Sequence, residues 1–248
     1  MMHTLERYFS IGENTPLSDR IAEGVLKTVI PAGKAALENP NDYEARASIM
    51  WAGTISHNDL TGLGRDVFMA VHQMEHELSG MDEKIAHGAG LSALWASWAR
   101  YVYKDDVSRF AQYAVNVWNI EMDFEHPEKT ALAGIQATED YFKSLDMPVS
   151  LRELNVDPAS FEELAEKCTN YGKRTLAGYQ GIRVSRILLK SIKWHIKILG
   201  SYFDPSDAGN AQIKIKTVSR RKNIPALETV LLSYICTRLP KAGSAEKL

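Results

Sequence analysis

The stretch VHQMEHELSGMDEKIAHG, residues 71–88, combines a helical pattern with three closely spaced histidines. His72 and His76 are four residues apart, so a helix projects both imidazoles from one face. His87 follows beyond Gly80, where the next apolar run begins. A histidine pair at this spacing is often only solvated or hydrogen-bonded, and the third histidine shifts the interpretation toward a metal site.

Helical periodicity continues on both sides of this stretch, and we find no convincing strand before residue 180. The expected helices run over residues 2–9, from an N-cap at Ser18 and Asp19 to about residue 39, over 41–57, from Asp66 to Gly80, over 87–103, 107–118 and 127–142, and from Pro158 onward. We also expect Trp51, Trp95, Trp98 and Trp118 to lie in the core. The fold class predicted is all-α, a bundle of about eight helices.

The composition is that of a globular protein, with 45% hydrophobic and 24% charged residues. A net charge of -2 argues against nucleic acid or an anionic membrane surface as the main partner. No apolar run is long enough to span a membrane, and no signal-peptide pattern is evident. Cys168 and Cys236 form no cluster, which is typical of a reducing compartment. We therefore expect a cytoplasmic protein.

The charge is unevenly distributed along the chain. Residues 1–179 carry 16 basic against 27 acidic residues, whereas residues 180–248 carry 13 against 4. We predict a helical domain over 1–179 and a basic tail of uncertain fold over 180–248. The basic amphipathic run at 187–198 makes a membrane-surface or nucleic-acid role conceivable, but a divergent or fused end without a selected function is the favoured interpretation.

Two enzymatic interpretations compete for the histidine cluster. In the first, His72, Glu75 and His76 form the HxxEH motif of a zinc metallopeptidase, in which Glu75 is the general base. That interpretation leaves His87 without a role. It also needs a further carboxylate ligand, for which Glu121, Asp123 and Glu139 are the candidates.

In the second, the sequence resembles the iron-containing alcohol dehydrogenases of the butanol dehydrogenase type over residues 1 to about 179. The segments that carry the resemblance are MHTLERYF (2–9), MWAGT (50–54), HQMEHELSG (72–80), HG (87–88) and NYGKR (170–174). The resemblance implies the C-terminal, metal-binding helical domain of that family, which is dehydroquinate synthase-like.

In that family one divalent ion, Fe2+ or Zn2+, is bound by an aspartate, by a histidine one helical turn later and by two further histidines. By motif, the resemblance implies that His3, His72 and His87 are the metal ligands here. His76 corresponds to a histidine near the nicotinamide, so we expect it to relay a proton, with His76 and His87 facing the NAD(P) cofactor. The implied substrate is a small alcohol or aldehyde.

This sequence departs from the family pattern in two respects. The aspartate partner of His3 would lie before Met1, and no glycine-rich pyrophosphate turn of the kind found in the N-terminal nucleotide-binding domain is evident. We therefore expect a fragment that binds Fe2+ or Zn2+ weakly and does not turn over alcohol by itself. A homodimer stays open, as does a third alternative, a non-catalytic helical fragment that binds no metal.

Overall fold

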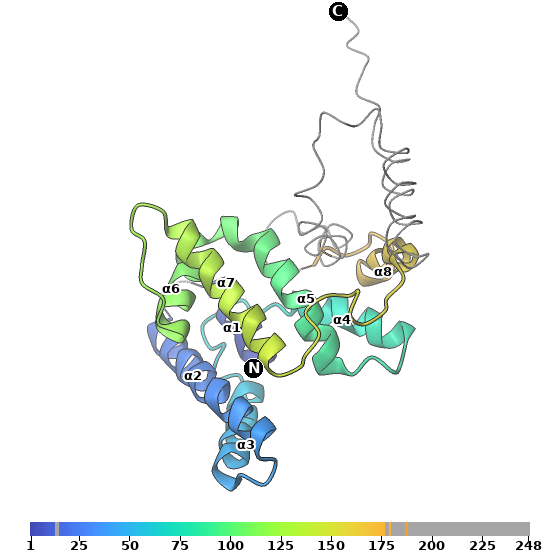
Figure 1. The fold of residues 1–248 in the computed structure, drawn as a ribbon. Coiled ribbons are helices and arrows are strands. Elements are labelled where there is room, and N and C mark those ends of the chain that lie inside the picture. Colours follow the sequence, from blue (N-terminus) through green and yellow to red (C-terminus); the bar gives the residue numbers. More distant parts are fainter. Residues whose placement is uncertain (13–14, 177–178, 180–186, 188–248) are drawn as a thin grey trace, which may run out of the picture. The chain divides into compact units, whose positions relative to one another are not determined.

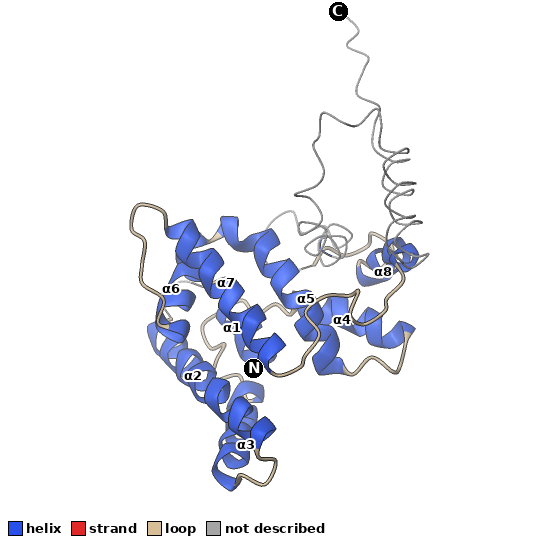
Figure 2. Ribbon diagram, viewed as in Figure 1, coloured by secondary structure: helices blue, strands red, loops and turns tan. Residues whose placement is uncertain are grey.

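The computed structural model describes residues 1–12, 15–176, 179 and 187, and these residues are almost entirely helical (Figures 1 and 2). The helices are α1 (Met2–Tyr8), α2 (Pro16–Glu38), α3 (Tyr43–His57), α4 (Ala70–Met81), α5 (His87–Val102), α6 (Val107–Trp118), α7 (Pro127–Ser144) and α8 (Phe161–Cys168), with 3₁₀ turns at Tyr103–Asp105 and Pro158–Ser160. In the described part of the chain no strand forms, which confirms the predicted all-α class. No described helix combines the length and apolarity needed to cross a membrane.

All the described residues belong to one compact unit. The predicted basic tail, including its amphipathic run, lies outside the described residues apart from Ile187. The predicted boundary near residue 180 therefore stays a prediction.

Helix α1 is short but almost completely enclosed by its neighbours. Of its residues, only His3 is not buried. Phe9, directly after α1, stacks on Phe110 with ring centroids 4.2 Å apart and meets the edge of Tyr113 at 5.1 Å. Trp98 also packs on the ring of Phe9. This aromatic core holds α1 against α5 and α6.

The remaining helices pack in pairs around this core. Helices α2 and α3 form a hairpin, α6 lies along α7, and α4 packs on both α5 and α8 (Figure 1). The α6 and α7 backbones approach closely at Gly134, where an added Cβ would lie 2.6 Å from the Cβ of Ala114. A larger residue would force these two helices apart.

Two predicted helix starts are wrong, for different reasons: Pro16 suits the first position of a helix, and a long-range hydrogen bond holds Asp66. Helix α2 begins at Pro16, so Ser18 and Asp19 lie inside its first turn rather than at its cap. Helix α4 begins at Ala70 and not at Asp66, whose N–H donates to the carbonyl of Ile11 at 2.8 Å in an isolated antiparallel bridge.

The tryptophan prediction is only partly confirmed. Trp95 and Trp98 are fully buried, and Trp118 is half-buried. Trp51 is 66% exposed on α3, so its core assignment is wrong. The α2–α3 hairpin has little packed against that face of α3, and helical periodicity alone cannot reveal a missing neighbour.

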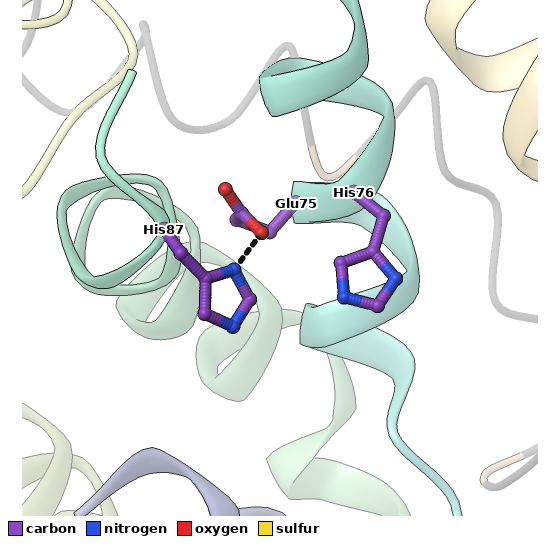
Figure 3. A group of neighbouring side chains, drawn as sticks. All are labelled: Glu75, His76 and His87. Carbon is purple, nitrogen blue, oxygen red and sulfur yellow. Dashed lines mark hydrogen bonds and ion pairs between the residues drawn. The ribbon is translucent and has the colours of Figure 1, made fainter. Parts of the chain in front are cut away.

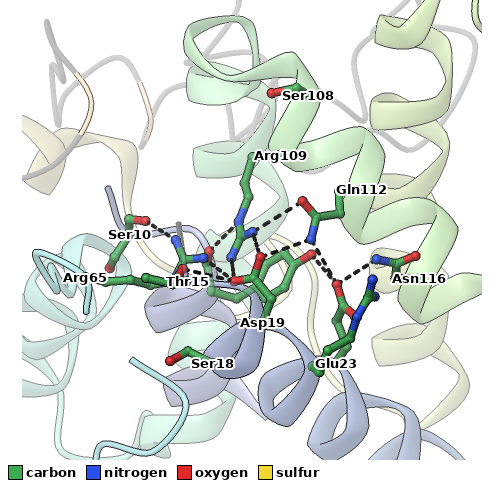
Figure 4. A network of polar contacts seen from close by, with 12 residues as sticks. Ser10, Thr15, Ser18, Asp19, Glu23, Arg65, Ser108, Arg109, Gln112 and Asn116 are labelled. Carbon is green, nitrogen blue, oxygen red and sulfur yellow. Dashed lines mark hydrogen bonds and ion pairs between the residues drawn. The ribbon is translucent and has the colours of Figure 1, made fainter. Parts of the chain in front are cut away.

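A buried ionic network ties α2 to α6 and to the loop before α4 (Figure 4). Asp19 receives a bidentate pair of hydrogen bonds from Arg109, at 2.6 and 2.7 Å, and also an ion pair from Arg65. Gln112 donates to Asp19 and to Glu23, both at 3.1 Å. Burial alone would raise the pKa of Asp19, but the hydrogen bonds and charge of Arg109, with Gln112 and Arg65, outweigh it and hold the pKa far below the usual value.

We predict that Asp19→Asn lowers the free energy of unfolding by about 3 kcal/mol at pH 7, because it leaves two enclosed guanidinium groups without their counter-charge. Urea unfolding followed by circular dichroism measures the change. Asp140→Asn, at a side chain that is 60% exposed and 3.7 Å from Lys143, is the control and should change stability by less than about 0.5 kcal/mol.

Wild type and Asp19→Asn also test the pH dependence of the stability. Since the folded-state pKa of Asp19 lies below the unfolded value of 3.8, its stabilisation is present at neutral pH and is lost as the pH falls below that value. The difference in free energy of unfolding between wild type and Asp19→Asn should therefore become smaller in acid. A gap that is absent at pH 7, or constant down to pH 2, would contradict this role of Asp19.

Candidate metal centre

Three helices bring His3, His72 and His87 to one place. His3 lies on α1, His72 on α4, and His87 is the first residue of α5. The ring centroids of His3 and His72 are 4.2 Å apart, and those of His72 and His87 are 5.2 Å apart. Imidazoles that share one tetrahedral ion, with metal–nitrogen bonds of about 2 Å, have centroids about 5 Å apart. His3 and His87 thus each lie beside the ring of His72.

His72 is buried and is bound on one side only. Its Nδ1 is hydrogen-bonded to the Glu6 carboxylate, and the backbone N–H groups of Val71 and His72 donate to the same carboxylate at 2.6 and 3.2 Å. Its Nε2 is buried and has no hydrogen-bond partner among the described residues. A buried nitrogen without a partner is unfavourable, and a cation beside it would satisfy its lone pair.

His87 and His76 lie beside a second buried carboxylate (Figure 3). Glu75 is fully buried and binds the Nδ1 of His87 and the hydroxyl of Ser79. One donor atom from each of Glu75, His76 and His87 lies within 4.8 Å of the others. Because Glu75 and His87 already bind each other, we interpret this group as an imidazole–carboxylate pair beside a second imidazole, His76. His76 is exposed, with its centroid 5.5 Å from that of His87 and an interplanar angle of 28°.

This geometry does not fit the HxxEH peptidase interpretation. A general base must reach the water that it deprotonates, whereas Glu75 is fully buried and engaged by His87 and Ser79. Two of the three candidate carboxylates downstream are also in use. Glu139 pairs with Arg100 and Lys143. Asp123 accepts the backbone N–H groups of residues 125 and 126.

The structure adds neighbours that sequence reasoning did not find. Glu6 contacts His72 across a separation of 66 residues, and no local motif indicates such a pair. His57, at the end of α3, places its ring centroid 4.1 Å from that of His3, and its Nδ1 lies 2.8 Å from the carbonyl of Gly53. The helix expected over residues 41–57 ends at His57, but its spacing does not indicate a contact with His3.

Its surroundings keep His3 neutral. Burial lowers its pKa most, and the neighbouring His72, His57 and Arg7 lower it further, to about 4. A neutral imidazole is the form that binds a metal ion. His3 therefore has the protonation state of a ligand throughout the neutral range.

Comparison with known proteins gives one family over most of the chain. The model of the "Fe-containing alcohol dehydrogenase family, C-terminal" matches residues 1–188. NADH-dependent butanol dehydrogenase A of Clostridium acetobutylicum is 39% identical over 189 residues, which is 76% of this chain and 48% of that relative. The NADPH-dependent aldehyde reductase YqhD of Escherichia coli is 34% identical over 71% of this chain and 44% of its own length.

Solved structures agree with these matches. The substrate- and cofactor-free aldehyde reductase YqhD of E. coli has a TM-score of 0.70 at 31% identity, covering 76% of this chain and 50% of its own. NADH-dependent butanol dehydrogenase A of Thermotoga maritima has a TM-score of 0.69 at 30% identity, covering 76% and 49%. The chain spans about half the length of the relatives it matches.

We predict that His3 titrates with a midpoint of about 4 in the metal-free chain, because burial and the neighbouring cations disfavour its charged form. The chemical shifts of its ring protons, followed by NMR as a function of pH, measure this midpoint. His57→Ala removes one of the neighbouring imidazoles and should raise it. A midpoint near 6.5 in the wild type would mean that His3 lies outside the cluster.

Proposed function

The chain belongs to the iron-containing alcohol dehydrogenase family, and from this premise we propose that it forms the metal-binding half of an NAD(P)-linked alcohol dehydrogenase or aldehyde reductase of the butanol dehydrogenase type. The observation that carries the proposal is the buried, unpartnered Nε2 of His72, whose ring lies beside those of His3 and His87. An alcohol dehydrogenase of this kind needs neutral imidazoles around one cation.

The donor set fits Fe2+ or Zn2+. His3, His72 and His87 would hold the ion, and three protein nitrogens leave coordination positions for a further ligand and for substrate. The lowered pKa of His3 favours binding, since protons compete less with the metal for that nitrogen. When bound, the ion supplies Lewis acidity toward an alcohol or aldehyde oxygen, and NAD(P) accepts or supplies hydride.

The residues of the chain have separate tasks in this proposal. His87 is partly exposed, with 46% of its side chain accessible, so its outer edge can face both the ion and the nicotinamide. His76 is exposed beside His87 and is free to exchange a proton with solvent. We assign it the proton relay between substrate and water.

The substrate and cofactor classes rest on the relatives. Their names specify butanol dehydrogenase and aldehyde reductase activities with NADH or NADPH, and we propose a small alcohol or aldehyde as the substrate of this chain. We propose a cytoplasmic location and a homodimer as part of the same function. We propose no nucleic-acid or membrane partner. We propose further that the chain binds its metal weakly and is inactive without a nucleotide-binding partner domain.

Joining residues 1–248 to the preceding N-terminal half of the C. acetobutylicum relative tests the proposed activity. We predict that the anaerobically metal-loaded chimera oxidises NADH with butyraldehyde, whereas the chain alone does not. His72→Ala should reduce the rate to background, because it removes a ligand. His76→Ala should lower kcat about 100-fold while metal stays bound, because only proton transfer is impaired.

Asp140→Asn, a change at an exposed side chain, is the control and should leave the rate unchanged. A folded, metal-loaded chimera without activity would refute the proposed function. A chimera whose activity survives His72→Ala would refute the metal centre.

A further inference from the structure

Two helices of the metal centre repeat the same pattern, a histidine followed three residues later by a glutamate. His3 and Glu6 form this pair on α1, and His72 and Glu75 form it on α4. In neither helix does the glutamate bind the histidine that precedes it. Glu6 of α1 binds His72 of α4, and Glu75 of α4 binds His87 of α5. Helix α1 thus orients an imidazole of α4, and α4 orients an imidazole of α5.

Both carboxylates are fully buried, and each meets an Nδ1 atom. An ionised carboxylate can only accept a hydrogen bond, so the imidazole must carry its proton on Nδ1. Its Nε2 then keeps a lone pair, which is the form that binds a metal. The unpartnered Nε2 of His72 has this character.

We propose that Glu6 and Glu75 are positioning residues that fix His72 and His87 in the Nδ1–H tautomer with Nε2 free for the ion. This inference rests on the proposed function, since it concerns the same metal centre. Carboxylates behind ligating histidines raise their basicity and restrict ring rotation, and losing one typically weakens metal binding 10- to 100-fold.

Glu6 is itself held in place by the start of α4. That helix has no side-chain cap of its own at Met69. The Glu6 carboxylate, which comes from α1, accepts the N–H groups of Val71 and His72 instead. The interaction that caps α4 therefore also holds the Glu6 carboxylate against His72.

Glu75 is held by different contacts. Ser79, one turn later on α4, donates a hydrogen bond to it. Gly90 on α5 leaves the space that its side chain occupies, since an added Cβ would lie 2.6 Å from the Glu75 Cγ. Gly88 on the same helix has no such neighbour, because its nearest contact would be the Met147 Cε at 3.8 Å. These two glycines make a matched pair of test positions.

The first experiment reads the tautomers in the full, metal-free chain. Two-bond proton–nitrogen correlation spectra at neutral pH distinguish Nδ1–H from Nε2–H imidazole, with assignments from His72→Ala and His87→Ala. We expect Nδ1–H for both residues. In Glu75→Gln we expect His87 to lose this preference and His72 to keep it, because the side-chain amide that replaces the carboxylate can donate as well as accept. An Nε2–H tautomer in the wild type, or an unchanged His87 in Glu75→Gln, would overturn the proposal.

The second experiment measures Zn2+ affinity by competition with a chromophoric chelator. Glu75→Gln and Gly90→Ala should each weaken binding 10- to 100-fold. Glu23→Gln and Gly88→Ala are the matched controls and should leave affinity within about twofold. Glu23 is also a buried carboxylate with several hydrogen bonds, but it belongs to the Asp19 network. Circular dichroism confirms that each variant is folded.

The outcomes separate this inference from the proposed function. Unchanged affinity in folded Glu75→Gln and Gly90→Ala, or an equal loss in Glu23→Gln, would overturn the positioning role while leaving the metal centre intact. Absence of Zn2+ binding by the wild-type chain would contradict the proposed metal centre. The tautomers of the metal-free chain would still decide what the two carboxylates do.

Discussion

The buried carboxylate of Glu6, facing the first turn of α4, is the interaction on which the rest of the structure depends. A charged group in the interior is strongly unfavourable unless it is paired, and this one is satisfied only when α1 and α4 lie in one register. Directly after α1, Phe9 packs against the aromatic rings of α5 and α6. A helix of seven residues is thereby fixed by both contacts, and the position of His3 beside His72 follows.

The centre draws its side chains from helices rather than from loops. Its histidines come from α1, α4 and the first residue of α5, and their rings lie in an almost continuous row that also includes His57 and His76. Rigid elements hold donor atoms more accurately than loops do. The row is exposed at both ends, at His57 and His76, and buried at His72 in its middle.

The long apolar periodicities predicted the helices well, because amphipathic faces report which side is buried. The failures at Asp66, Ser18 and Trp51 have different origins. A backbone partner distant in sequence holds Asp66, Pro16 favours an earlier start of α2, and Trp51 lies on an exposed face of α3. The ligand set His3, His72 and His87 came from a family resemblance, and the structure places His3 and His87 each beside His72. Glu6 was not predicted as the partner of His72, because a contact over 66 residues leaves no trace in local spacing. The histidine–glutamate spacing repeated at residues 3–6 and 72–75 does not identify which glutamate meets which histidine.

The stoichiometry of metal binding after anaerobic reconstitution with saturating Fe2+ or Zn2+ tests the central claim most directly, with the full chain compared to His72→Ala and His87→Ala. If α1, α4 and α5 build one centre from His3, His72 and His87, the wild type binds about one equivalent and each substitution abolishes it. Binding that persists in both variants, or no binding by the folded wild type, would contradict the account.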